Sequence, residues 1–333
     1  MVSGLLAKSA SRIPMPWMRA LSGVRLVVPY YHMVSDRHVP HVSHLYSFRG
    51  VAAFTADAEY LARHFQPVTL SDIVAALNGG APLPRACVHL TFDDGFREMH
   101  EVVAPILRRV GLPATFFLNT AFLDRGGLAH HNVISLILDA VASDPVRASA
   151  AETWAQANLP APSQPAALRQ RLLSIRYAQH AQVRALADHL HIDIGGYVAE
   201  AQPYLSSDQV KSLLNQGFSI GAHSHDHPHY ADLSLADQLA QTCTSMEFLE
   251  TRFAIQPKSF AFPHNDVGVG PEFFARVFDE KLLDVSFGTA GLVPHFHPRN
   301  IERFTMEKTD APAAQILAHQ FARSAYQKFR PRS

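Results

Sequence analysis

The sequence predicts an α/β protein built as a distorted (β/α)7-type barrel with a helical insertion. Short apolar runs that fit buried strands alternate with amphipathic stretches that fit helices, about seven times along the chain. The segment at about 124–202 interrupts this alternation with a composition rich in Ala, Leu and Gln. Polar motifs directly follow two of the apolar runs, and barrels of this kind carry their functional groups at the carboxyl ends of the strands.

The first half of the barrel is predicted from runs whose apolar residues are continuous or alternate, as in buried strands. These runs cover residues 25–31, 88–92 and 114–118. The amphipathic stretches between them predict a helix over 54–65, one that Ser71 caps and Gly79–Gly80 ends, and one over 97–109 that Gly111 closes.

The insertion is expected to be helical and to lie over or beside the barrel. Helical stretches are predicted at 131–142, 166–177 and 179–191. Pro145, Pro160, Pro162 and Pro165 indicate loops between them.

The regular alternation returns at Ser206, which forms a capping box with Gln209 and begins a helix that ends at Gly217. Strands are then predicted at 218–222, 259–262 and 283–287, and helices at 234–253, 271–278 and 311–326. This divides the chain into an N-terminal extension (1–24), the barrel with its insertion (25–310), and a C-terminal helix and tail (311–333).

Composition excludes several classes of protein. The chain has 333 residues, and its 29 Lys and Arg balance 29 Asp and Glu. A nucleic-acid-binding protein that relies on bulk charge needs a basic surplus, so no nucleic-acid partner is expected. The two cysteines, Cys87 and Cys243, cannot build a disulfide framework or a Cys-based zinc site. The 20 His, in contrast, direct attention to metal chemistry.

The N-terminal extension has two interpretations. No apolar run reaches the roughly 18 residues that cross a bilayer, so no transmembrane segment is expected. Pro14, Pro16 and Arg19 interrupt the apolar core that a secretory signal would need. We favour a solvated segment of a cytoplasmic protein. The alternative is weak, peripheral contact with a membrane surface through residues that precede the first acid, Asp36: Lys8, Arg12, Arg19, Arg25, Leu5, Leu6, Trp17 and Leu21.

Two carboxylates follow the predicted strand at 88–92. Asp93 and Asp94 are successive residues at the strand end, where side chains point in opposite directions, so one can bind a cation while its neighbour faces the reacting water. Gly95 permits a tight turn into the next helix. An ordinary Asp-Gly turn is the alternative interpretation.

A histidine cluster follows the predicted strand at 218–222. It reads His223-Ser224-His225-Asp226-His227-Pro228-His229, and four His within seven residues are hard to explain as core packing. His223, His225 and His227 could ligate a metal in pairs. Two His and one Asp with an open position are typical of a catalytic metal site.

These segments resemble the polysaccharide deacetylase family, also called carbohydrate esterase family four or the NodB-homology domain. Its T-F-D-D-G motif is similar to Thr91-Phe92-Asp93-Asp94-Gly95, and its H-[S/T]-x-x-H-P motif to His223-Ser224-His225-Asp226-His227-Pro228. Flanking stretches at 31–34, 111–117, 218–222 and 259–263 also resemble the family. The resemblance covers about residues 25–125 and 203–305.

The resemblance implies a metal held by Asp94, His223 and His227, with Asp93 as the general base. His225 falls at a variable position of the motif and is left out. Ser224 would support the site by hydrogen bonding. One divalent cation is expected, zinc first, with cobalt, nickel or manganese also compatible.

The chain departs from the family at its third motif, which here is Ala261-Phe262-Pro263-His264-Asn265. The Arg that steadies the base in many members is absent there, and we expect Arg303 to replace it. His264 stands where the family has an aromatic residue whose backbone N–H helps to bind the oxyanion, and a backbone donor survives this change. The general acid has no clear motif, so His295, His297 and His32 all remain candidates.

The expected function is a metal-dependent hydrolase that removes N-acetyl groups from a polysaccharide or glycan precursor. Two alternatives stay open: an O-acetyl esterase on a carbohydrate, and a catalytically inactive carbohydrate-binding descendant. Aromatic residues in or near the insertion could stack on a sugar or belong to its core: Trp154, Tyr197 and Tyr204.

Overall fold

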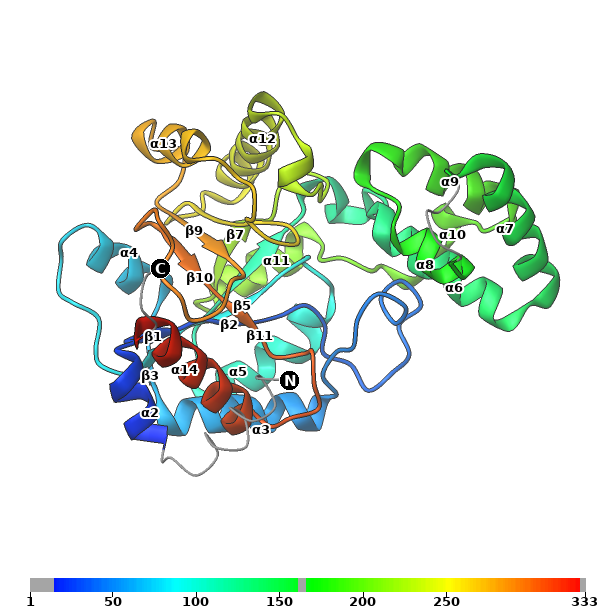
Figure 1. The fold of residues 1–333 in the computed structure, drawn as a ribbon. Helices are drawn as coiled ribbons and strands as arrows, with labels where there is room; N and C mark the ends of the chain where they lie inside the picture. Colours follow the sequence, from blue (N-terminus) through cyan, green and yellow to red (C-terminus); the bar gives the residue numbers. More distant parts are fainter. Residues whose placement is uncertain (1–14, 161–165, 330–333) are drawn as a thin grey trace.

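The computed structural model describes residues 15–160 and 166–329, and its centre is a parallel, nearly closed barrel (Figure 1). Every strand pair of its sheet is parallel. The strands follow one another around the sheet in this order: β10 (Asn300–Glu302), β9 (Val285–Gly288), β8 (Ser259–Ala261), β7 (Ser219–Ala222), β6 (Ala114–Leu118), β5 (Leu90–Phe92), β2 (Pro29–Tyr31) and β11 (Phe304–Thr305).

One short segment closes this barrel. β10 and β11 stand at the two ends of the strand order, yet Arg303 alone separates them in the chain. β10 pairs with β9, and β11 pairs with β2. Residues 300–305 therefore act as one strand that changes partner at Arg303, which confirms the predicted barrel of seven strand positions.

Helices cover the outside of the barrel. In chain order they are α3 (Val51–His64), α4 (Leu70–Leu77), α5 (Ala104–Val110), α11 (Ser207–Asn215), α12 (Leu235–Phe253), α13 (Pro271–Asp279) and α14 (Ala313–Phe329). A small parallel sheet lies beside the barrel and contains β1 (Leu26–Val27), β4 (Cys87–Val88) and β3 (Gln66–Pro67). Three short helical turns complete this part: η1 (Met99–Val103), η2 (Thr120–Arg125) and η4 (Tyr230–Asp232).

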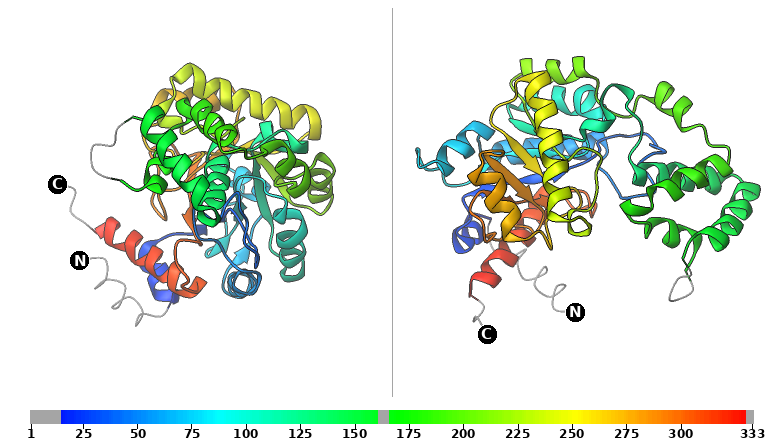
Figure 2. Two further views of the ribbon diagram at one scale, coloured as in Figure 1. Left: turned by 90° about the vertical axis from the view of Figure 1, so that its right-hand side faces the viewer. Right: turned by 90° about the horizontal axis from the view of Figure 1, so that it is seen from above.

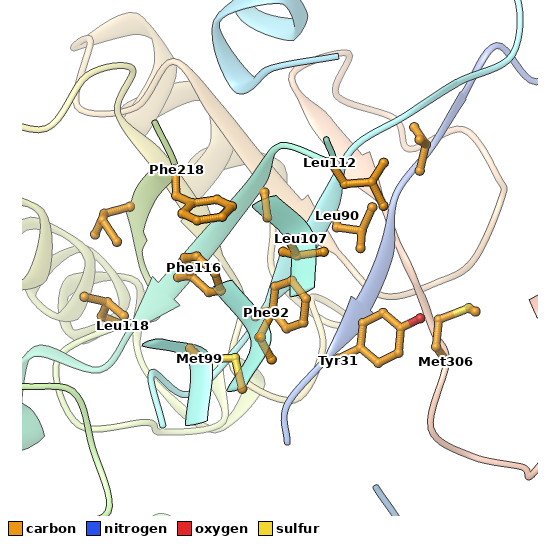
Figure 3. Close-up of a cluster of buried hydrophobic side chains, with 14 of the residues drawn as sticks. Tyr31, Leu90, Phe92, Met99, Leu107, Leu112, Phe116, Leu118, Phe218 and Met306 are labelled. Atoms are coloured by element: carbon orange, nitrogen blue, oxygen red, sulfur yellow. The ribbon is translucent and has the colours of Figure 1, made fainter. Parts of the chain in front are cut away.

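Aromatic packing dominates the core between the strands and the helices. Phe116 of β6 lies between Phe92 of β5 and Phe218, with ring centroids 5.2 and 5.3 Å away (Figure 3). All three rings are buried. Burying a side chain of this size contributes about 1.5–3 kcal/mol, so these contacts hold β5, β6 and the start of β7 together.

Most predicted elements are present, and the differences have local causes. The predicted strand over 25–31 is two strands, because β1 joins the small sheet and β2 joins the barrel. Thr69, not Ser71, caps α4, since Thr69 and Asp72 satisfy each other's backbone N–H groups in a capping box. The closing strand at 300–305 was not predicted, because buried polar residues such as Glu302 and Arg303 break the apolar pattern.

The N-terminal helix α2 (Met15–Ser22) packs along α14, as Figures 1 and 2 show. Met18 is buried, so a solvated extension is wrong for this part of residues 1–24. Trp17 and Leu21 are exposed. Leu5, Leu6, Lys8 and Arg12 lie outside the described residues. Among the helices that the structure describes, none is long and apolar enough to cross a membrane.

The insertion forms a helical lobe beside the barrel (Figures 1 and 2). Its helices are α6 (His130–Ser143), α7 (Pro145–Asn158), α8 (Leu168–Leu173), η3 (Tyr177–Gln179), α9 (His180–His189) and α10 (Ile194–Ala201). α7 is absent from the predicted helices, because a proline such as Pro145 usually indicates a loop. Pro145 in fact occupies the first turn of α7 behind an Asp144 cap, a position that proline favours.

The lobe has its own hydrophobic core, which extends into the loop over residues 36–49. Val39 and Val42 of this loop are buried against residues of the lobe. Tyr204 is also buried there, stacked on Phe96 and Phe122, so a sugar-stacking role is wrong for Tyr204. Trp154 and Tyr197 pack against the same core.

Candidate active site

The two polar motifs converge at the carboxyl ends of β5 and β7. Asp94 Oδ1 lies 3.5 Å from His223 Nε2 and 3.2 Å from His227 Nε2. All three side chains are buried. Asp94 and His227 have positive φ, as does Gly95, so the chain turns sharply as each strand ends and aims these side chains at one another.

The chemistry of these three side chains fits a divalent cation. Asp94 Oδ1 is buried and has no hydrogen-bond partner, although it faces two imidazoles. His223 Nδ1 lies 2.8 Å from the Ala261 carbonyl, which can only accept, so Nδ1 carries the hydrogen and Nε2 has a free lone pair. Burial lowers the pKa of His223 to about 4, although the negative charge of Asp93 acts to raise it. The His223 ring is therefore neutral at neutral pH. The ligand atoms all lie within 4.8 Å of one another.

Asp93 is held by Arg303. The guanidinium places its two terminal nitrogens 2.7 and 2.8 Å from the two carboxylate oxygens, and both side chains are buried. Burial alone would raise the pKa of Asp93, but the Arg303 charge and hydrogen bonds outweigh it and the pKa is lowered. Arg303 therefore fixes the Asp93 carboxylate through two hydrogen bonds. It reaches Asp93 because it lies at the point where the closing strand changes partner.

His32 and Glu307 form a second charged pair beside the carboxylates. Glu307 Oε2 lies 2.6 Å from His32 Nδ1, while Oε1 accepts the backbone N–H groups of His32 and Met33. Burial alone would lower the pKa of His32, but the charge and hydrogen bond of Glu307 raise it to about 9. His32 is thus a protonated imidazole at neutral pH, and its side chain is 23% exposed.

Two further side chains reach the site from outside the barrel strands. The Tyr46 hydroxyl donates to Asp94 Oδ2 at 3.2 Å, and the Tyr46 ring lies 4.7 Å from that of His32. His131, in the first turn of α6, places its ring 4.3 Å from the ring of His227. Sequence reasoning missed Tyr46, His131 and Glu307, because it searched strand ends and these residues lie in a loop, in the insertion and after the closing strand.

The remaining residues of the two motifs have supporting contacts. Ser224 Oγ accepts the His227 backbone N–H at 3.0 Å. The His264 ring lies 4.6 Å from that of His227, and the His264 residue has a positive φ. The backbone N–H of His264 has no acceptor among the described residues. His225 hydrogen-bonds to Thr120 and does not join the Asp94 group.

His295 and His297 lie in a different cluster. His295 Nε2 is 3.7 Å from Asp266, and these two residues group with Glu302. The His297 ring stacks on Phe278 at 4.5 Å. Within the described chain, no hydrogen bond, ion pair or ring contact joins either histidine to Asp93 or Asp94.

Comparison with known proteins identifies the family. Residues 80–269 match the polysaccharide deacetylase family over more than half of the chain. The chain belongs to this family. A curated member, the poly-β-1,6-N-acetyl-D-glucosamine N-deacetylase of Escherichia coli (strain K12), is 44% identical over 52 residues. That stretch is 16% of this chain and 8% of the relative, so the chain matches only a small part of the curated protein.

Solved structures of deacetylases share the fold of this family member. The Streptococcus pyogenes deacetylase PplD in complex with acetate superposes with a TM-score of 0.58 at 12% identity, over 89% of this chain and 98% of its own. IcaB from Ammonifex degensii superposes with a TM-score of 0.54 at 15% sequence identity, over 89% of this chain and 96% of its own. A de-N-acetylase from Aggregatibacter actinomycetemcomitans superposes with a TM-score of 0.55 at 15% sequence identity, over 88% of this chain and 100% of its own. At these identities the likeness confirms the barrel fold alone.

Proposed function

We propose that this protein is a metal-dependent hydrolase that removes N-acetyl groups from a polysaccharide or glycan precursor. The observation that carries the proposal is the convergence of Asp94, His223 and His227 on one point, next to an Asp93 carboxylate that a buried guanidinium orients. A divalent cation at that point would polarise the acyl oxygen and make a bound water more acidic. Zinc is the first candidate for this ligand set, with cobalt, nickel or manganese as alternatives.

The protein's own groups divide the remaining work. Asp93, ionised and fixed by Arg303, accepts the proton of the attacking water. The unpaired backbone N–H of His264 is the donor for the oxyanion that develops on the acyl group. His264 lies beyond the end of β8, so the strand ladder does not occupy this N–H.

His32 is the general acid in this proposal, rather than His295 or His297. The sugar amine is a poor leaving group unless its nitrogen is protonated as the carbon–nitrogen bond breaks, so the site needs a donor that holds a proton at neutral pH. Glu307 keeps His32 in that form. An amine leaving group needs this proton more than the alcohol of an O-acetyl ester does, so a protonated His32 favours N-acetyl over O-acetyl substrates. The E. coli relative is named as an N-deacetylase of poly-N-acetylglucosamine, which agrees with this choice.

Acetate release tests the proposal. Zinc-loaded protein is incubated with β-1,6-linked N-acetylglucosamine oligomers and, in parallel, with O-acetylated sugars, and free acetate is measured. Asp93→Asn should lower the rate about 10²–10⁴-fold, because it removes the base and leaves the three ligands in place. Asp208→Asn, an exposed change on α11, is the matched control. Rates for wild type and Asp93→Asn that both equal the protein-free background would leave only the inactive, carbohydrate-binding alternative, and equal rates above that background would refute Asp93 as the base.

A further inference from the structure

We propose that Tyr46 is a positioning residue for Asp94, and that the helical insertion holds the loop that delivers Tyr46 to the site. The inference rests on the proposed function in one respect, namely that Asp94 binds a cation. Neither the family motifs nor the strand-end pattern includes Tyr46, which lies in the loop over residues 36–49.

The contact with Asp94 divides the two oxygens of the carboxylate between two tasks. Oδ2 accepts the Tyr46 hydroxyl at 3.2 Å, whereas Oδ1 faces His223 and His227 and has no hydrogen-bond partner. An ionised carboxylate can only accept hydrogen bonds, and a phenol is a donor at neutral pH. The bond therefore fixes the plane of the carboxylate with Oδ1 aimed at the imidazoles. Without it, the carboxylate can rotate about the Cβ–Cγ bond and lose this aim.

The same side chain also contacts the proposed acid. The rings of Tyr46 and His32 are 4.7 Å apart and tilted by 37°. The side chain of Tyr46 thus contacts both the proposed cation ligand Asp94 and the proposed acid His32.

Helix α6 of the insertion anchors the loop that carries Tyr46. Asn132 donates to the His41 carbonyl at 2.7 Å, and Ser135 donates to the Pro40 carbonyl at 2.7 Å. Asp139 Oδ1 lies 2.5 Å from His38 Nε2 and 3.2 Å from His44 Nε2. Val39 and Val42 of the loop are buried in the core of the lobe. The loop therefore owes its position to the insertion as much as to the barrel.

The first turn of α6 touches the site directly. The His131 ring lies 4.3 Å from that of His227. Helix α6 consequently contacts His227 through its own His131. It also supports the loop whose Tyr46 contacts Asp94. The insertion is in this view a part of the active site rather than an appendage beside it.

Cation affinity tests the role of Tyr46. Binding of Zn²⁺ and Co²⁺ to the full chain is measured by calorimetry for wild type, Tyr46→Phe and Tyr60→Phe. Tyr46→Phe should bind about 10-fold more weakly or worse, since partners of metal ligands typically contribute 10–100-fold to affinity. It should also lower kcat for acetate release at an unchanged KM. Tyr60, whose ring lies 4.2 Å from that of His64 on the outer helix α3, is the matched control and should change neither quantity. An affinity of Tyr46→Phe within twofold of wild type would overturn the proposal.

A readout without cation separates this inference from the proposed function. Crystal structures of cation-free wild type and Tyr46→Phe should show the Asp94 carboxylate rotated or in two orientations in the variant alone. If it keeps one wild-type orientation, the positioning role is wrong. If wild type binds no cation, the proposed function fails, while these two structures still decide the role of Tyr46.

The anchoring by the insertion has its own test. The double change Ser135→Ala, Asp139→Ala removes side-chain contacts from α6 to the loop without altering the barrel. It should weaken Zn²⁺ binding in the same direction as Tyr46→Phe. Unchanged affinity would refute the role of these two α6 side chains in positioning the loop.

Discussion

Replacing Glu307 by Gln should move the alkaline limit of acetate release to lower pH. Glu307 raises the pKa of His32 to about 9, against an ordinary value of 6.5 and against burial, which lowers it. Gln keeps an oxygen for the two backbone N–H groups of His32 and Met33 but removes the charge beside the ring. The pKa of His32 should therefore fall to 6.5 or below, a shift of about 2.5 pH units.

The size of the effect follows from the protonated fraction of His32. At pH 8 a group of pKa about 9 is roughly 90% protonated, whereas a group of pKa 6.5 is about 3% protonated, so the rate should fall about 30-fold. At pH 6 the rates should differ little. Initial rates of acetate release from pH 5.5 to 10 measure the shift, with the exposed Glu272→Gln on α13 as control.

The pH dependence of stability provides a second test of the His32–Glu307 pair. Because the folded-state pKa of His32 is raised, its contribution to stability is fully present below pH 6.5 and is lost as the pH rises through about 9. Glu307→Gln should thus be clearly less stable than wild type at pH 6, and the gap should narrow toward pH 10. An alkaline limb that stays in place, together with a stability gap independent of pH, would refute the assignment of His32 as the acid.

Three further outcomes are expected. Arg303→Met should destabilise the fold by about 3–5 kcal/mol in urea unfolding, because it leaves the buried Asp93 carboxylate without its partner; a loss below 1 kcal/mol would contradict the buried pair. Burial lowers the pKa of His89 to about 4 although its Nδ1 bonds the Val68 carbonyl. Its contribution is therefore present above pH 6.5 and lost as the pH falls through about 4, so wild type should lose about 3 kcal/mol from this residue between pH 7 and 4, and His89→Gln should lose correspondingly less. Removing the cation with a chelator should lower the melting temperature and adding Zn²⁺ at about 100 times its Kd should restore about 2.7 kcal/mol; Asp94→Ala, His223→Ala double-variant protein should show no such response to either treatment.

The barrel and the cation side of the site were predictable because each depends on short stretches of sequence. The Asp93–Asp94 pair and the His223–His227 spacing follow apolar runs, and parallel strands bring their carboxyl ends together. Arg303 was expected only through the family resemblance, since a lone Arg between two polar residues has no local signal for burial.

The other side of the site was out of reach of the sequence for a physical reason. Tyr46, His131 and Glu307 come from a loop, an insertion and a turn, whose relative positions depend on long-range packing rather than on periodicity. The loop histidines His295 and His297 carried the same residue type as a general acid, but α13 and Asp266 hold them in a separate cluster. Residue type alone therefore left three histidines as candidates for the acid, and only the tertiary contacts showed that Glu307 is paired with His32.

The position of Arg303 makes the proposed catalytic site depend on a segment that is synthesised late. A nascent chain that ends before residue 300 already contains every proposed ligand and the base, yet it lacks both the seam between β9 and β2 and the guanidinium that keeps Asp93 charged and aligned. Ribosome-bound intermediates of this length should accordingly be inactive toward acetylated sugars. Pairing of residues 300–305 with β9 and β2 closes the barrel and at the same time brings Arg303 to Asp93.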